Sequence, residues 1–471
     1  MDSHLPSARP LIERPPADWR RELGALVRLS TPLIGANLLQ MAIYSSDVIF
    51  VARLGPDALA AATLGVYFYS VVAFALIGLV SSAAPVIAAE LGRRRHAVRE
   101  VRRSFRMALW LSAAASLPFL LPLAYTETIL GWMRQDPVAA ASAARYTDIL
   151  LFALVPTVAS GVMRIAVSAL GRPGWAMTIT AAALAVNIVG NWILVFGELG
   201  APALGLTGAA IASLITALFM LAGYATILMR DRRLRRYRLF GKWWRPEWPR
   251  FVDLVRLGVP IALTMTFEGA VFSAAAFLMG LIGVTEVAAH AVALQIAAIA
   301  FQIPFGIAQG ATIRVGMAYG AADGDWIALA GRVALALGIG FMGLTAALLW
   351  AAPHFFVTLY LDDTPGNARA IALATRYLTV AAAFQIFDGA QTVAAGVLRG
   401  LQDTRIPMII AAIGYWIAGF GTAVLLGFRL GLAGVGIWIG LATGLAVVAV
   451  LLLLRWSMRR RIGLLPQPSR G

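Results

Sequence analysis

Long uninterrupted runs of hydrophobic residues dominate the sequence. Each run is roughly 20 residues long, the length that an α-helix needs to cross a bilayer. The runs recur from Ala25 to Trp456, with short polar or basic segments between them, and about twelve meet this criterion. They do not alternate between apolar and polar residues as the strands of a membrane barrel do. The pattern therefore predicts an all-α integral membrane protein with twelve transmembrane helices.

Composition and charge extend this picture. Of the 471 residues, 60% are hydrophobic and 13% are charged, which is too apolar for a soluble protein of this length. The net charge of +16 could suggest nucleic acid as a partner, but the basic residues gather in a few loops. They lie in the segments Arg93–Arg106, Arg230–Arg250 and Arg459–Arg461. These segments follow even-numbered spans, so we expect them and both termini to be cytoplasmic.

The central basic segment also carries aromatic residues, including Trp243 and Trp244. Aromatic and basic residues together form the interfacial belt of many membrane proteins, where they contact anionic lipid. We therefore expect the lipid bilayer, and no nucleic acid, as the partner of this segment.

The chain repeats itself at half its length. The stretch that ends at Pro32 resembles the one that ends at Pro260, and the same offset of 228 residues places Gly92 on Gly320. Each half then holds about six spans, so the halves have the same orientation and form two six-helix bundles related by a pseudo-two-fold axis along the membrane normal. The expected segments are a cytoplasmic tail (1–24), an N-lobe (25–229), a basic linker (230–250), a C-lobe (251–457) and a second cytoplasmic tail (458–471).

Three acidic residues lie deep inside apolar spans: Asp47, Glu268 and Asp388. An acid at this depth costs roughly 2.5 to 3.5 kcal/mol, so it normally faces a cavity or a partner and carries function. The repeat places uncharged residues opposite all three, namely Ala275, Gln40 and Ser160 in that order. A buried carboxylate can exchange a proton for Na⁺ or for an organic cation. The three acids therefore predict a transporter.

Other polar residues have competing interpretations. Asn187 and Asn191 share one helix face, where their amide oxygens could bind a hard cation or could equally well bond a neighbouring helix. Arg164 and Arg314 are expected to snorkel from helix ends, and Glu90 to be a solvated charge. The chain has no cysteine, its histidines are scattered and it lacks GxxxxGK[ST]. We expect no cofactor and no metal site beyond a Na⁺ ion near the acids.

Several runs resemble the multidrug and toxic compound extrusion (MATE) family, and within it the bacterial NorM-like branch. They are the stretch Ser46–Gly55, the triplet Phe267–Gly269, the stretch Ala288–Leu294 and the run Phe387–Gly400. They occur in the family's order, and the resemblance covers about Leu26 to Arg455.

This resemblance implies a monomeric transporter of a bacterial inner membrane that exports organic cations through a V-shaped cleft, in exchange for inward H⁺ or Na⁺. The coupling residues that it implies are Asp47, Asn187, Asn191 and Ser213 in the N-lobe and Glu268 and Asp388 in the C-lobe, with Na⁺ expected at Asp47/Asn187/Asn191 or at Glu268/Asp388. The expected substrate contacts are Gln40, Asp47, Glu268, Gln295, Phe384 and Asp388. Two positions depart from the family's pattern: Phe384 replaces a tyrosine and Asn191 an aspartate, and both changes weaken a Na⁺ site.

Two other functions were weighed. A flippase for lipid-linked precursors, from the same superfamily, would line its cleft with arginines that hold phosphate, whereas the acids here favour cationic cargo. An integral-membrane enzyme would need a nucleophile with a base, or a metal cluster, at membrane depth. The sequence offers neither, so no enzymatic activity is expected.

Overall fold

The computed structural model describes residues 18–93 and 97–466. Within these ranges the secondary structure is helical and contains no strand. Twelve of the described helices are long and apolar enough to cross a membrane. The predicted all-α class and the number of spans are therefore confirmed.

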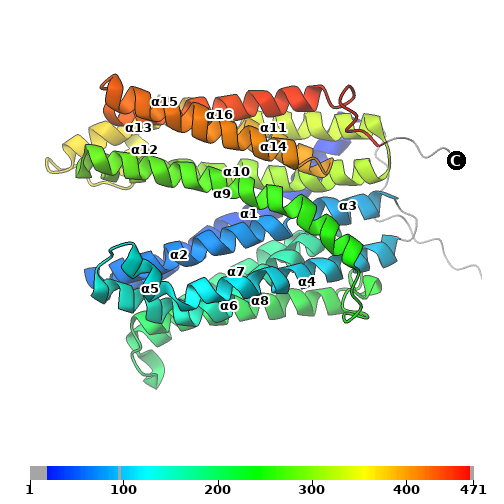
Figure 1. Cartoon of the computed structure of the whole chain (residues 1–471), viewed down its shortest axis with the longest axis horizontal. Helices are drawn as coiled ribbons and strands as arrows, with labels where there is room; N and C mark the ends of the chain where they lie inside the picture. Colours follow the sequence, from blue (N-terminus) through cyan, green and yellow to red (C-terminus); the bar gives the residue numbers. More distant parts are fainter. Residues whose placement is uncertain (1–17, 94–96, 467–471) are drawn as a thin grey trace, which may run out of the picture.

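The two halves of the chain form two groups of helices, the N-lobe and the C-lobe, which lie one above the other in Figure 1. The N-lobe contains α1 (Trp19–Ala52), α2 (Pro56–Val80), α3 (Ala83–Arg93), α4 (Ala97–Ala124), α5 (Thr126–Trp132), α6 (Pro137–Ala169), α7 (Gly174–Phe196), η1 (Glu198–Gly200) and α8 (Leu206–Arg230). After η2 (Arg235–Tyr237), the C-lobe contains α9 (Trp248–Ile282), α10 (Val284–Gly320), α11 (Gly324–Ala351), α12 (Pro353–Thr358), α13 (Ala368–Gly400), α14 (Arg405–Ala412), η3 (Ile413–Phe420), α15 (Gly421–Val424), η4 (Leu425–Arg429) and α16 (Ala433–Ser457).

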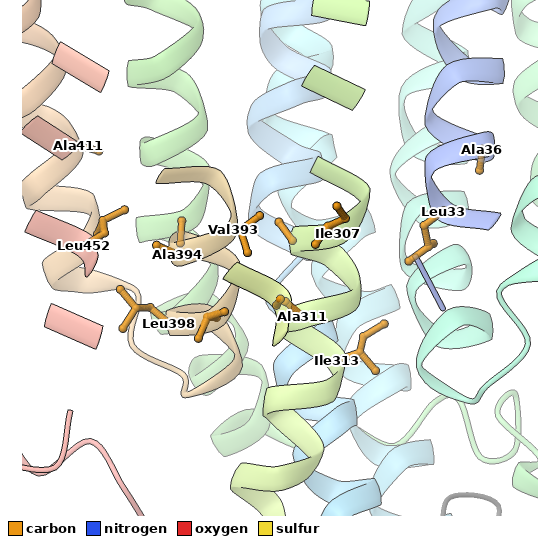
Figure 2. Packing of buried hydrophobic residues seen from close by; sticks show 14 of the residues in the cluster. Leu33, Ala36, Ile307, Ala311, Ile313, Val393, Ala394, Leu398, Ala411 and Leu452 are labelled. Atoms are coloured by element: carbon orange, nitrogen blue, oxygen red, sulfur yellow. The ribbon is translucent and has the colours of Figure 1, made fainter. Parts of the chain in front are cut away.

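Within the C-lobe, α10 packs closely on α13. Figure 2 shows Ile307 and Ala311 of α10 beside Val393 and Leu398 of α13, and all four side chains are buried. A Cβ atom at Gly396 of α13 would lie 2.6 Å from a backbone oxygen of α10. Small residues allow this approach, and dispersion contacts then hold helices together in a membrane, where lipid is as apolar as the side chains.

The start of α1 and the end of the described chain lie at the same end of the bundle. Arg460, just after α16, forms an ion pair with Asp325 at the start of α11 (3.6 Å). The neighbouring Trp326 donates a hydrogen bond to Glu22 in the first turn of α1 (3.2 Å). We refer to this end of the molecule as the termini end.

The contacts between the lobes occur at equivalent positions of the internal repeat. A Cβ atom at Gly78 of α2 would lie 2.9 Å from Ala262 of α9, and one at Gly306 of α10 would lie 2.4 Å from Ile34 of α1. Gly78 and Gly306 are 228 residues apart, and so are Ile34 and Ala262. The α2–α9 and α1–α10 contacts are therefore equivalent, which confirms the pseudo-two-fold relation.

The glycine pair found in the repeat meets at the termini end. A Cβ atom at Gly92 would lie 2.0 Å from the backbone oxygen of Met317, and one at Gly320 would lie 1.9 Å from that of Ala89. Only glycine fits at such distances. Here α3 of the N-lobe and α10 of the C-lobe touch backbone to backbone, and no side chain separates the lobes.

Further from the termini end, the lobes separate. Gly306 and Gly310 of α10 pack against α1, and Gln295 and Ile299 lie on the same helical face about two to four turns earlier. Both of these residues are exposed. On α1, Tyr44 is likewise 43% exposed. We refer to the space bounded by these faces as the inter-lobe cleft.

A buried ion pair joins the lobes at the termini end. Arg314 of α10 donates from Nε to Glu22 of α1 (2.8 Å), with a second contact from its other nitrogen, and its guanidinium lies 5.2 Å from the centre of the Trp326 ring. Glu22 is 0% exposed and Arg314 is 7% exposed. The expectation that Arg314 snorkels is therefore wrong, because a buried carboxylate partners it. Arg164 of α6 also has an internal partner, Asn37 of α1 (3.4 Å).

The basic segment before α9 is held against the N-lobe by ion pairs. Arg250 donates to Glu90 (3.4 Å) and to Ser104 (2.6 Å), and Glu247 pairs with Arg103 and Arg106 of α4. Glu90 is 7% exposed, so the expectation that it is a solvated charge is wrong. It is one of the acids that neutralise this segment.

Replacing Glu22 with alanine leaves the charge of Arg314 buried without its carboxylate partner. Breaking a buried pair in this way costs about 3–5 kcal/mol. We therefore expect a clear fall in the midpoint of thermal unfolding of the purified protein. The double replacement Glu22→Ala with Arg314→Met removes the unpaired charge and should restore most of the lost stability.

The matched control is Asp325→Ala. In its ion pair with Arg460, the two side chains are 92% and 67% exposed, and exposed pairs contribute little. This variant should unfold at the temperature of the wild type. If Glu22→Ala unfolds there too, the buried pair does not hold the lobes together.

Candidate functional site

Asp47 in α1 is the centre of a polar cluster within the N-lobe. Its Oδ1 accepts hydrogen bonds from Asn187 (2.8 Å) and Asn191 (2.7 Å) of α7, and its Oδ2 accepts one from Ser213 of α8 (2.9 Å). The structure thus brings together the four residues that were expected to form the N-lobe site, from three helices.

The surroundings of Asp47 suit an ionised carboxylate. All three of its neighbours donate, and a carboxylate can only accept. Asn187 and Asn191 are 0% exposed, and no basic side chain of the described residues forms an ion pair with Asp47. The amide oxygen of Asn191 is buried without a hydrogen-bond partner. A carboxylate and a free carbonyl oxygen are ligands that suit a hard cation.

Gln391 of α13 joins the two acids of the C-lobe. Its Nε2 donates to Glu268 of α9 (2.9 Å) and lies 3.2 Å from Asp388, one turn earlier on α13. Asp388 is 5% exposed and Gln391 is 3% exposed. One amide group thus lies between both carboxylates, and its orientation decides how they are stabilised.

Tyr415 fixes that orientation. Its hydroxyl donates to the Oε1 of Gln391 (2.9 Å), so that the Nε2 must face the acids. Tyr415 lies in η3, a π-helical stretch with i→i+5 bonding inside the span Arg405–Arg429. The wider turn changes which side chains face α13, and such segments are frequent at functional sites.

Arg399 provides a positive charge near the same cluster. It lies at the end of α13, and its guanidinium interacts electrostatically with Glu268. Sequence reasoning missed Tyr415 and Arg399, and it did not assign Gln391 to the site. The signal for Gln391 was the spacing of three from Asp388, which places both on one helix face.

The remaining residues expected at the substrate site lie in different surroundings. Gln295 is exposed on the face of α10 that bounds the inter-lobe cleft, and Gln40 of α1 is half-buried. Phe384 is 1% exposed and packs edge-on against Trp438 (5.5 Å between ring centres). Its ring lies within the C-lobe core, one turn before Asp388.

The two acid clusters lie in separate lobes and involve different helices. The N-lobe cluster joins α1, α7 and α8, and the C-lobe cluster joins α9, α13 and η3. Among the described residues, no three His, Cys, Asp or Glu side chains gather as they would around a metal ion.

Comparison with solved structures reproduces the fold. A eukaryotic MATE transporter, AtDTX14, superposes with a TM-score of 0.84 at 22% identity, covering 93% of this chain and 96% of that chain. A MOP superfamily transporter from Pyrococcus furiosus, described as having a binding pocket of reversed polarity that suggests a different function, superposes with a TM-score of 0.81 at 21% identity, covering 95% and 97%. Both likenesses concern the fold alone.

Sequence comparison is more specific. A probable multidrug resistance protein NorM of Mesorhizobium japonicum is 48% identical over 445 residues, covering 94% of this chain and 95% of that protein. A protein of the same description from Brucella suis is 45% identical, covering 93% of each chain. The MatE family profile matches residues 32–193 and 260–425, one stretch in each lobe. With its two-lobe helical fold and its matched halves, the chain belongs to the MatE family.

Proposed function

We propose that the protein is a secondary active multidrug efflux antiporter. It exports cationic, lipophilic or aromatic compounds through the inter-lobe cleft in exchange for inward H⁺ or Na⁺. The observation that carries the proposal is that each lobe holds carboxylates among apolar helices, half-buried at Asp47 and Glu268 and buried at Asp388, and that hydrogen-bond donors surround them. The names of the similar proteins, multidrug resistance protein NorM, support the choice of cargo.

In the N-lobe, a coupling ion would act on the hydrogen bonds of Asp47. An ionised carboxylate accepts from Asn187, Asn191 and Ser213 together. A proton on Asp47 turns one of its oxygens into a donor, so at least one of these three neighbours must rotate away. A Na⁺ ion would instead draw amide oxygens towards the carboxylate. Either ion changes how α1 packs on α7 and α8.

In the C-lobe, the ion would act through Gln391. Two carboxylates that share one amide repel each other, and the repulsion is strong in apolar surroundings. A proton or a cation between Glu268 and Asp388 removes it, and Tyr415 keeps the Gln391 amide directed at whichever acid remains charged. Arg399 contributes a positive charge that interacts electrostatically with Glu268.

Exchange follows if the ion and the organic cation compete for the same negative charge. A cationic compound in the cleft is attracted while the acids are ionised and is released when an ion neutralises them. Coupling requires only this difference in affinity between the two conditions. We propose that the compound contacts five side chains at some stage of transport: Asp47, Glu268, Asp388, Gln40 and Gln295. Phe384 lies in the C-lobe core beneath this surface and supports its shape.

The orientation in the membrane follows from the basic loops. Arg93, Arg250 and Arg460 lie at or near the termini end, so we place that end in the cytoplasm of a bacterial inner membrane. The inter-lobe cleft then opens outward, and the described conformation is the one that releases cargo. We propose that the protein acts as a monomer, since both acid clusters are formed within one chain.

The alternative is a flippase for lipid-linked precursors. Arg399 favours it, as a positive charge close to the C-lobe cluster. Against it, Arg399 already interacts electrostatically with Glu268, and Arg314 forms an ion pair with Glu22. A transport assay that offers an organic cation as cargo distinguishes the two functions.

The carboxylates are tested by single neutral replacements, Asp47→Asn, Glu268→Gln and Asp388→Asn. We expect each to lower the rate of ethidium efflux from vesicles, driven by an imposed H⁺ or Na⁺ gradient, at least about tenfold, which corresponds to a rise of about 1.4 kcal/mol in the activation free energy of transport. Comparing the two gradients identifies the coupling ion.

The control for these three variants is Glu198→Gln, which neutralises an exposed acid in η1. It should transport like the wild type. Wild-type efflux in all three carboxylate variants would refute the coupling proposal, and a wild-type protein that moves no organic cation would favour the flippase.

The donors around Asp47 are tested by Asn191→Ala. Removing a hydrogen bond to a charged group costs about 1.5–3 kcal/mol, so the ion concentration that gives half-maximal efflux should shift about tenfold or more. Asn37→Ala is the matched control, since this buried amide of α1 bonds to Arg164 instead. Equal ion dependence in both variants would mean that Asn191 has no part in coupling.

Alternating access is tested with a crosslink at the termini end. A Cβ atom at Gly310 would lie 3.6 Å from that of Ser30, within the range of about 3.5–4.5 Å found in disulfides, and the chain has no cysteine of its own. The oxidised double variant S30C/G310C should stop transporting, because its lobes cannot part there, and reductant should restore efflux. The single variants, oxidised in the same way, are the controls. Unchanged efflux in the crosslinked protein would exclude opening at this end.

A further inference from the structure

A cavity separate from the inter-lobe cleft lies away from both acid clusters, at the termini end of the C-lobe. Its volume is about 320 Å³, and it lies between α9 and the turn that joins α13 to α14. Its wall is formed by Arg256, Leu257, Gln402, Asp403, Thr404, Arg405 and Ile406. The coupling mechanism uses none of these residues.

The wall of this cavity carries an uncompensated positive charge. Arg256 and Arg405 are both exposed, and neither forms an ion pair within the described part of the chain. Asp403 is the acid of the wall, and Arg455 of α16 neutralises it through two contacts (2.5 and 3.2 Å). The cavity therefore has two arginine side chains that are available to an anion.

Thr404 adds a polar group without a partner. It is 4% exposed, and its hydroxyl forms no hydrogen bond among the described residues. Buried polar groups are normally satisfied, so an unpaired one requires an explanation. Thr404 immediately precedes α14, where the first backbone N–H groups and the helix dipole also favour a negative charge. A hydroxyl, two guanidinium groups and a helix start together suit a phosphate.

The cavity lies at the boundary between charged and apolar surface. On its membrane side, α9 exposes Val259 (42%) and α14 exposes Ile409 (45%), and both helices belong to membrane spans. A phosphate bound here would have its attached chains next to these apolar side chains. This arrangement suits a lipid headgroup better than a free phosphate ion, which has no apolar part to bury.

We propose that this cavity binds the phosphate of an anionic phospholipid headgroup. Arg256 and Arg405 provide the charge and the Thr404 hydroxyl donates a hydrogen bond. The acyl chains lie along Val259 and Ile409. A lipid bound in this way connects α9 to the α13–α14 turn, and α9 and α13 are the helices that carry Glu268 and Asp388.

The test is native mass spectrometry of the purified full-length protein with phosphatidylglycerol, with phosphatidylcholine and with inorganic phosphate. We expect the wild type to retain phosphatidylglycerol in preference to phosphatidylcholine. The double variant R256Q/R405Q should retain about 25-fold less phosphatidylglycerol, because each of the two arginines contributes roughly a factor of five near an anionic lipid. T404V should weaken retention by a smaller factor, and millimolar inorganic phosphate should not displace the lipid.

The matched control is R232Q/R233Q, which removes two exposed arginines just after α8, outside the cavity wall. It should retain phosphatidylglycerol like the wild type, and elution as a single species in size-exclusion chromatography verifies that each variant is folded. Equal retention in the two double variants would overturn the proposal. So would equal retention of phosphatidylcholine, or displacement of the lipid by inorganic phosphate.

Discussion

The backbone contact between the lobes at the termini end sets the geometry of the whole molecule. Lipid provides no hydrophobic force between helices, so the lobes are held by close packing and by polar contacts. Gly92 and Gly320 allow α3 and α10 to touch, and the ion pair between Glu22 and Arg314 lies at the same end. Because the lobes are joined there in this conformation, they lie apart only towards the opposite end. The inter-lobe cleft is the consequence.

The helices that form this contact also carry the acids. Asp47 lies on α1, which packs on α10 across the interface, and Glu268 lies on α9, which packs on α2. Each carboxylate is bonded to donors on other helices of its own lobe. In the mechanism that we propose, a change in its charge moves a helix that contacts both lobes. This arrangement offers a physical route from an ion in one lobe to the width of the cleft.

The residues that pack the helices together follow the internal repeat, whereas the acidic residues do not. Positions of close helix contact have equivalents 228 residues away, such as Gly78 and Gly306. The acids do not: Ser160, the equivalent of Asp388, bonds to a backbone oxygen of its own helix (2.7 Å), and Ala275, the equivalent of Asp47, is a buried apolar residue. The residues that pack the helices therefore follow the internal symmetry, whereas the acid clusters of the two lobes do not.

The sequence by itself determined the spans, the duplication and the acids inside apolar spans, since the length of an apolar run and a repeat offset are properties of the chain alone. The neighbours of Asp47 were implied by the resemblance to the MATE family, since the i, i+4 spacing of Asn187 and Asn191 only places them on one helix face. The sequence could not determine which helix faces meet. Only the tertiary structure paired Arg314 with Glu22. It also turned Tyr415 towards Gln391 through a π-helical segment that apolar periodicity does not reveal. Helix packing decides which polar residues far apart in the chain meet, and local sequence patterns do not predict these pairs.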